Sequence, residues 1–172
     1  MIEKISLRKY NLGDIRHIMK LFVNDKILRP VSVPKKASEI TRAYEMKWLK
    51  KTIGQYRKKN PEEYNLVITM NDEPIGGIGI GSINYYNNRA ACGYWIGEPY
   101  WSRGYGTKAL KVFLKEVIKK FKLVRIVAYT NDYNKASARI LEKNGFRLEC
   151  IRKKAVKEGR RYLNDKQYVL VK

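Results

Sequence analysis

The stretch that decides the fold is Tyr94-Trp95-Ile96-Gly97-Glu98-Pro99-Tyr100-Trp101-Ser102-Arg103-Gly104-Tyr105-Gly106-Thr107-Lys108-Ala109-Leu110. A strand-like run ends near Ile96, a short loop carries glycines at 104 and 106, and a helical pattern starts at once. Glycine lets the backbone adopt positive φ and approach a ligand closely. Because the first N–H groups of a helix lack intrahelical partners, this junction predicts an anion site suited to a pyrophosphate. Arg103 and Lys108 add positive charge beside it.

Taken alone, the junction is equally compatible with an ordinary turn between a strand and a helix. No Gly-Lys-Ser/Thr follows the glycines, so it is not a Walker loop, and the Gly-x-Gly-x-x-Gly dinucleotide pattern is not present either. Whether the junction is an anion site or an ordinary turn therefore depends on the rest of the chain.

Hydrophobic periodicity outward from the junction predicts one α/β domain over residues 1–172, with a mixed sheet of about seven strands and about four helices. An antiparallel meander precedes the junction and a crossover follows it, so the strands 90–96 and 123–129 are expected to be parallel neighbours that splay apart. The expected strands are 4–10, 64–70, 74–83, 90–96, 123–129, 146–156 and 161–171. The expected helices are 11–22, 40–56, 109–121 and 135–143.

Local signals set the expected helix ends. Ser38 is predicted to cap the second helix, and Asn144-Gly145 is predicted to end the last one in a left-handed conformation. Pro30 and Pro34 interrupt the first helical segment.

The predicted crossover carries a second motif. Asn134-Lys135-Ala136-Ser137 opens the expected helix, and Leu141-Glu142-Lys143-Asn144-Gly145-Phe146 closes it. Both motifs, in this order and on these elements, resemble the GCN5-related N-acetyltransferases. The cofactor loop of that superfamily carries Gln/Arg-x-x-Gly-x-Gly/Ala, and its next crossover carries Asn, a hydroxyl or small residue three positions later, and Lys-x-Gly-Phe. The expected element order agrees over essentially the whole chain.

The resemblance implies that acetyl-CoA is the co-substrate and lies where the two parallel strands splay. It places the pyrophosphate on the backbone N–H groups of the loop and the pantetheine arm along the end of the preceding strand. The implied cofactor-binding residues are Trp95, Ile96, Ser102, Arg103, Gly104, Tyr105, Gly106, Thr107 and Asn134.

The resemblance also implies a direct attack of the acceptor amine on the thioester, with the Ile96 N–H as an oxyanion donor. The tyrosine that many relatives use as general acid falls on Leu141 here, which moves that role to Ser137. Asn134 would orient substrate or water. The acid often found early in the preceding strand falls on Ala91, so the base is unassigned and Glu98 is a weak candidate. For Ser137 the alternative is a helix hydroxyl bonded back to its own chain.

Within the superfamily, the run from Gly93 to Thr107 is most similar to the branch that acetylates the N-termini of ribosomal proteins. One departure from the general loop pattern, Trp101 at the Gln/Arg position, is common in that branch.

Charge is the most unusual feature of the composition. Lys and Arg number 37 against 16 acids, a formal net charge of +21. Thermophilic proteins raise Lys and Glu together, whereas here most of the bases have no acid to pair with. A polyanionic partner such as ribosomal RNA is one explanation, and a lysine-rich solvated surface is the other.

Other classes of protein are disfavoured. No apolar run has the length of a membrane span, and Met1-Ile2-Glu3-Lys4-Ile5 begins no secretory signal, so a cytoplasmic, non-membrane protein is expected. With His17 as the single histidine, neither a metal site nor a Ser-His-Asp triad is expected. Cys92 and Cys150 are predicted to be small core residues rather than nucleophiles.

For the acceptor, the sequence favours the α-amino group of a protein, most simply a ribosomal one. A surface of net charge +21 repels a polyamine. An α-amino group, with a pKa of about 8 against about 10.4 for a lysine-like amine, also has more free base at neutral pH. A small-molecule amine such as a polyamine or aminoglycoside, and a non-catalytic RNA-associated protein, are the alternatives.

Overall fold

The computed structural model describes residues 4–30 and 36–172. Within them the strands form one sheet in the order β1-β2-β3-β4-β5-β7-β6. The strands are β1 (Ile5–Lys9), β2 (Tyr64–Met70), β3 (Glu73–Asn84), β4 (Arg89–Ile96), β5 (Arg125–Asn131), β6 (Arg147–Glu158) and β7 (Arg161–Val171). The predicted seven-stranded mixed sheet and its order of elements are confirmed.

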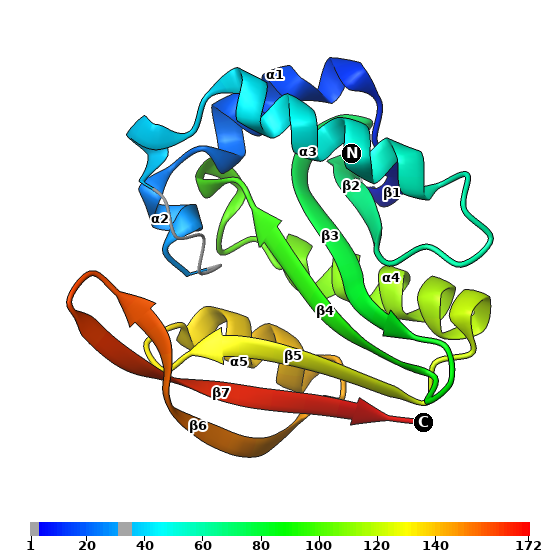
Figure 1. The fold of residues 1–172 in the computed structure, drawn as a ribbon, viewed down its shortest axis with the longest axis vertical. Coiled ribbons are helices and arrows are strands. Elements are labelled where there is room, and N and C mark those ends of the chain that lie inside the picture. The colour runs from blue at the N-terminus through cyan, green and yellow to red at the C-terminus, as the bar shows by residue number, and fades with distance from the viewer. Residues whose placement is uncertain (1–3, 31–35) are drawn as a thin grey trace.

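The sheet opens in its middle. β4 and β5 are parallel and pair from Arg89 opposite Arg125 to Cys92 opposite Ala128, and beyond that point their pairing stops. Figure 1 shows the result as a V, with β1–β4 on one arm and β5–β7 on the other. The predicted splay between these two strands is therefore confirmed.

Helices cover both faces of the sheet (Figure 1). On one face lie α1 (Ile15–His17), the π-helical turn η2 (Ile18–Phe22) and α3 (Arg42–Gln55), and on the other lie α4 (Tyr105–Phe121) and α5 (Lys135–Lys143). Successive side chains of β2 point to opposite faces of the sheet and therefore pack against different helical layers. Leu66 and Ile68 join the core under α4, while Val67 packs with Ile15 and Leu49. The remaining short helices are η1 (Leu12–Asp14), α2 (Asp25–Leu28), η3 (Ala37–Glu39) and η4 (Glu98–Tyr100).

Two details of the expected helices are corrected. The first helical segment breaks at Val23, whose ψ of 71° is not helical, and Asn24 then caps α2, so five α-helices replace the expected four in the described residues. Thr41, not Ser38, caps α3, because Ser38 lies in η3 and Ile40 is extended between them. The interruption expected at Pro34 lies outside the described residues. The left-handed residue predicted at the end of α5 is present at Gly145, with φ 85°.

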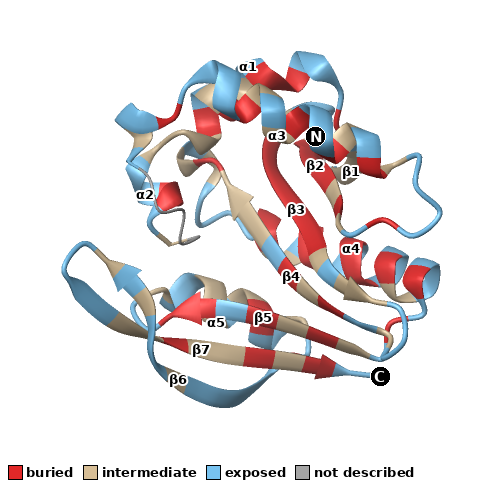
Figure 2. Ribbon diagram, in the orientation of Figure 1, coloured by how far each residue is buried: buried red, intermediate tan, exposed pale blue. Residues whose placement is uncertain are grey.

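The two cysteines differ from the expectation in one respect. Cys92 is buried on β4, as predicted, and burial raises the pKa of its thiol to about 12. Cys150 is exposed, because β6 is the last strand of the sheet and is solvated along most of its length (Figure 2).

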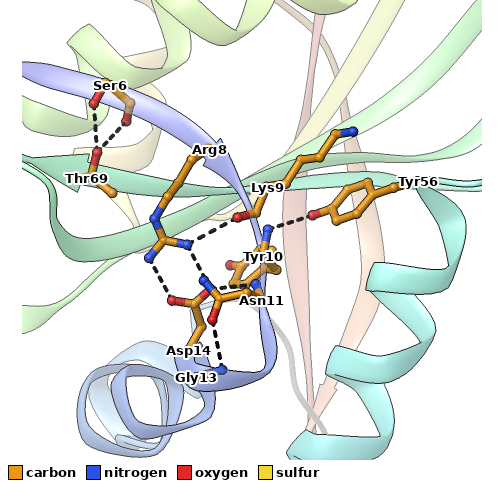
Figure 3. Close-up of polar contacts among 9 residues, drawn as sticks. All are labelled: Ser6, Arg8, Lys9, Tyr10, Asn11, Gly13, Asp14, Tyr56 and Thr69. Carbon is orange, nitrogen blue, oxygen red and sulfur yellow. Dashed lines mark hydrogen bonds and ion pairs between the residues drawn. The ribbon is translucent and has the colours of Figure 1, made fainter.

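A polar network joins β1 to the helical layer that follows it (Figure 3). Arg8 donates to both oxygens of Asp14, at 2.8 and 2.7 Å, and the backbone N–H of Asn11 donates to the same carboxylate at 2.8 Å. The hydroxyl of Tyr56, the C-cap residue of α3, accepts from the Tyr10 N–H at 2.9 Å. The network therefore fixes the segment that carries Tyr10 between the sheet and α3.

Asp14→Asn is expected to destabilise the fold by about 2 kcal/mol. Breaking a fully buried ion pair typically costs about 3–5 kcal/mol, and the smaller value is expected here because the Arg8 side chain is 36% exposed. Burial by itself would raise the pKa of Asp14, but the bonds from Arg8 and Asn11 outweigh it and lower that pKa. The stabilisation is therefore present above the unfolded pKa and is lost as the pH falls through the folded one.

Urea unfolding at pH 7 and pH 3 measures this effect, and the difference between Asp14→Asn and wild type should shrink at the lower pH. Glu62→Gln is the matched control, because it removes an exposed ion pair with Lys58. An equal loss in both variants would contradict the assigned role of Asp14.

Candidate active site

A cavity of about 760 Å³ lies where β4 and β5 diverge. Its floor is formed by positions of β3 and β4 that carry little or no side chain, and these positions are neighbours, since Gly79 pairs with Gly93 and Gly81 with Ala91. A Cβ added at Gly81 or Gly93 would meet no atom within 4 Å. The sheet surface at this point is therefore open to a ligand.

Aromatic side chains from the helical layer and β4 form the wall. Tyr10 and Trp48 pack edge to face with their ring centroids 5.3 Å apart, and Phe22 and Trp95 lie 5.0 Å apart. A Cβ at Gly77 would come within 2.5 Å of both the Tyr10 hydroxyl and Trp95 Nε1. Glycine at 77 is therefore required for these two rings to reach the sheet.

The end of β4 presents its backbone to the gap. The Gly97 N–H donates to the Ile75 carbonyl at 2.8 Å, so the alternation of an antiparallel ladder turns the N–H groups of Ile96 and Tyr94 away from β3. They face the side where β5 has already diverged. The Ile96 carbonyl accepts a bond from Trp101 Nε1 at 2.6 Å, which fixes the loop that follows.

That loop delivers the start of α4 beside the gap. Gly104 is the N-cap residue, with φ 76°, and no side chain caps the helix. Ser102 also has positive φ, 61°. The first intrahelical hydrogen bond runs from the Lys108 N–H to the Gly104 carbonyl. The backbone N–H groups of residues 105–107 come before this bond and have no acceptor within the helix. Successive left-handed and helical residues of this kind form a concave anion site.

The other predicted loop residues have different surroundings. Ser102, Arg103 and Gly104 are exposed, whereas Tyr105 and Gly106 are buried. A Cβ at Gly106 would approach Ile140 of α5 to 2.9 Å, so this glycine permits close packing of α4 against α5. Thr107 is half-buried, and its carbonyl accepts from Asn144 at 3.3 Å.

Asn134 and Ser137 come together at the cavity. Asn134 caps α5 by accepting from the Ser137 N–H at 3.1 Å, and both residues line the cavity. The Ser137 hydroxyl lies 3.0 Å from the Tyr94 hydroxyl. Burial raises the pKa of Tyr94, so its hydroxyl remains protonated at neutral pH. A serine hydroxyl paired with a neutral phenol can pass a proton to a group in the cavity.

Glu98 is not brought into this group. It lies on η4, accepts from Asn24 at 3.0 Å and forms an ion pair with Lys26 of α2. The hydrogen bond from Lys26 lowers the pKa of Glu98, and the residue is not part of the cavity lining. Its carboxylate holds α2 to the loop.

Two cavity residues were missed by the reasoning from sequence. Tyr94 lies within the first motif, and its two-residue spacing from the buried Cys92 on β4 was the signal that places it on the same face of the sheet. Glu45 lies on the buried side of α3 with Trp48, Leu49 and Thr52, and a carboxylate at helical spacing with apolar residues was the available signal.

A mixed sheet that opens between two parallel strands, beside a helix whose start has no side-chain cap, is the arrangement of the N-acetyltransferase fold. The profile of the family described as an acetyltransferase (GNAT) domain matches residues 4–147. The chain belongs to this family, and it is an N-acetyltransferase.

Individual relatives are distant. An uncharacterised N-acetyltransferase, p20, of Bacillus licheniformis is 22% identical over 170 residues, covering 99% of this chain and 94% of the relative. The ribosomal L7/L12 α-N-protein acetyltransferase RimL, solved with coenzyme A, superposes with a TM-score of 0.86 at 19% identity, covering 97% of this chain and 93% of that one.

A spermidine N-acetyltransferase from Vibrio cholerae, solved with CoA and spermine, superposes with a TM-score of 0.85 at 19% identity, covering 97% and 95%. Relatives with protein and polyamine acceptors therefore share this fold, and the fold alone does not choose between them.

Proposed function

We propose that residues 1–172 form one N-acetyltransferase domain that transfers the acetyl group of acetyl-CoA to the α-amino group of a protein. The main support for the cofactor assignment is that three features of the structure lie next to one another. These are the concave start of α4, the backbone of β4 turned into the gap, and the cavity that contains Asn134 and Ser137. One elongated ligand with an anionic end and a reactive end fits all three.

In this proposal the pyrophosphate binds the backbone of 102–107, and Arg103 adds charge from solvent. The pantetheine arm pairs with the backbone at Trp95 and Ile96 like an added strand, because the Ile96 N–H faces the gap. The acetyl carbonyl then lies at the cavity, where a backbone N–H of β4 stabilises the oxyanion.

For the chemistry, the neutral amine attacks the thioester carbon, and the carbon–sulfur bond breaks as the tetrahedral intermediate collapses. Ser137 donates a proton to the leaving sulfur and takes up the proton that the nitrogen of the tetrahedral intermediate loses, while the Tyr94 hydroxyl, 3.0 Å away, orients the Ser137 hydroxyl. The Asn134 side chain holds Ser137 in place by accepting a hydrogen bond from the Ser137 backbone N–H. No described group of three or more His, Cys, Asp or Glu side chains could hold a metal, and no step above uses one.

The acceptor assignment is supported by surface charge. Lysines of α4 and its end are exposed, and none forms an ion pair with a described residue; they are Lys111, Lys115, Lys119, Lys120 and Lys122. A surface of this charge attracts RNA and repels a polycation. A ribosomal protein N-terminus, surrounded by RNA, fits it, and a cytoplasmic location belongs to the same proposal. No described helix is long and apolar enough to cross a membrane.

A comparison of acceptors tests this proposal. Wild-type enzyme with labelled acetyl-CoA should acetylate a ribosomal N-terminal peptide with a higher kcat/KM than spermidine. Co-sedimentation with ribosomes should fall steeply between about 50 and 200 mM salt, as counterion release requires. Efficient spermidine acetylation without ribosome binding at low salt would instead favour the polyamine alternative, and no acetyl transfer to any amine would contradict the proposal altogether.

A further inference from the structure

Among the described residues, one carboxylate of the cavity is buried and has neither a hydrogen-bond nor an ion-pair partner. Glu45, in the first turn of α3, is 4% exposed and lines the cavity. Its carboxylate accepts no hydrogen bond and forms no ion pair within residues 4–30 and 36–172. Buried carboxylates are normally paired, because their desolvation costs several kcal/mol otherwise. An unpaired one that faces a ligand cavity is a candidate for binding a cation there.

The other charged groups of the cavity are already neutralised. Asp165 of β7 accepts from Arg152 of β6 at 2.8 Å, and Glu63, before β2, lies 3.3 Å from Lys51. Arg152 also lies over the Tyr129 ring of β5, 4.0 Å from its centroid. The hydroxyls that line the cavity include those of Tyr10 and Tyr44. Among the described residues that line the cavity, Glu45 is therefore the one acid without an ion-pair partner.

The surroundings of Glu45 suit an alkylammonium group. Tyr10, which is close enough to interact electrostatically with Glu45, and Trp48, three positions after Glu45 on α3, add aromatic rings to this part of the lining, and such rings attract cations. The floor at Gly81, Ala91 and Gly93 leaves room for the chain behind the amine. Burial, without an opposing charge, raises the pKa of Glu45, which improves the carboxylate as a proton acceptor near neutral pH.

We propose that this part of the cavity is the acceptor subsite, and that Glu45 binds the single ammonium group of the acceptor and removes its proton. The proposal rests on the acetyltransferase function above and names the base that the sequence left unassigned. One unpaired carboxylate matches one positive charge, so the subsite selects a monocationic amine, such as a peptide N-terminus, over a polyamine with several charges.

The proton balance is complete. The ammonium gives one proton to Glu45 and becomes the free amine, which attacks the thioester. The nitrogen of the tetrahedral intermediate loses a second proton, which reaches the departing sulfur through Ser137. The products are the acetylated amine and CoA thiol, and Glu45 releases its proton to solvent before the next turnover.

Glu45→Gln tests the proposal, because it keeps the shape of the side chain and removes its charge. With an N-terminal peptide of pKa about 8, kcat/KM should fall about 30-fold at pH 7. The loss should shrink to a few-fold at pH 9, because the peptide is then already deprotonated. Asp72→Asn is the matched control, since it removes an exposed acid in the β2–β3 turn and should leave kcat/KM unchanged at every pH.

Stability separates this role from a structural one. A first-turn acid can stabilise a helix through its dipole, so a purely structural Glu45 would make Glu45→Gln less stable. Because burial raises the folded pKa of Glu45, its contribution to stability is present below the unfolded pKa and is lost as the pH rises through the folded pKa. At pH 7 the variant should therefore melt at the same temperature as wild type or higher, while its activity falls.

Three outcomes decide the proposal. A pH-dependent loss with unchanged acetyl-CoA affinity, partial recovery in Glu45→Asp, and a preference of wild type for a monoamine over spermidine support it. An unchanged rate, a loss that is equal at pH 7 and pH 9, or a lower melting temperature would overturn it while leaving the acetyltransferase assignment intact. If wild type transfers acetyl to no amine, the function itself has failed instead.

Discussion

Gly104→Val is expected to reduce acetyl-CoA affinity by at least about 1,000-fold, to below detection in calorimetry, because two effects combine at one position. Gly104 has φ 76°, a conformation that a β-branched residue avoids at a cost of about 1–2 kcal/mol. A Cβ there meets no protein atom within 4 Å, so the new side chain projects into open space. In the proposed complex that space holds the pyrophosphate, and the valine would displace it from the α4 amides.

Gly159→Val separates strain from steric exclusion. Gly159 lies in the β6–β7 turn with φ 59°, and its added Cβ also meets nothing within 4 Å. The two variants should lose similar thermal stability, about 2–8 °C for 1–2 kcal/mol in a chain of this size. Gly159→Val should nevertheless keep wild-type affinity for acetyl-CoA. Wild-type affinity in Gly104→Val would refute the cofactor site, and an equal loss in both variants would attribute the effect to strain.

Ser137→Ala is expected to lower kcat by about 100-fold with little change in KM for acetyl-CoA, because general acid catalysis typically contributes about 10²–10⁴. The hydroxyl pairs with Tyr94 from another element, which distinguishes it from a helix serine bonded back to its own turn. Tyr94→Phe should give a smaller loss of kcat, since Ser137 remains and loses only the hydrogen-bond partner that orients its hydroxyl.

Ser6→Ala is the control for this prediction. The Ser6 hydroxyl also pairs with another hydroxyl, that of Thr69 at 2.8 Å, but it lies between β1 and β2 and outside the cavity lining. Pre-steady-state kinetics should show that the loss in Ser137→Ala is in the chemical step. Unchanged turnover in that variant would remove Ser137 from the mechanism, whatever the effect of Tyr94→Phe.

Much of the fold was predictable because its signals are local. The β-type run 64–70 and the 3.6-residue period after the glycine loop are each set by residues within one element. The errors were local as well. Ser38 has the chemistry of a helix cap, but the extended Ile40 delays α3, and Thr41 takes the role. Cys150 has the character of a core residue, but its strand lies at the edge of the sheet.

The sequence by itself determined the order of elements, the glycine loop at the start of α4, and the placement of Asn134 and Ser137 on α5. Each depends on residues a few positions apart. Only the tertiary structure decided which groups meet in the cavity. Tyr94 reaches Ser137 across 43 positions, and Glu45 of α3 lines the same cavity as the glycines of β3 and β4. Whether a buried carboxylate has a hydrogen-bond or ion-pair partner depends on every helix and strand packed around it. Neither the periodicity of one element nor the spacing of a motif contains that information.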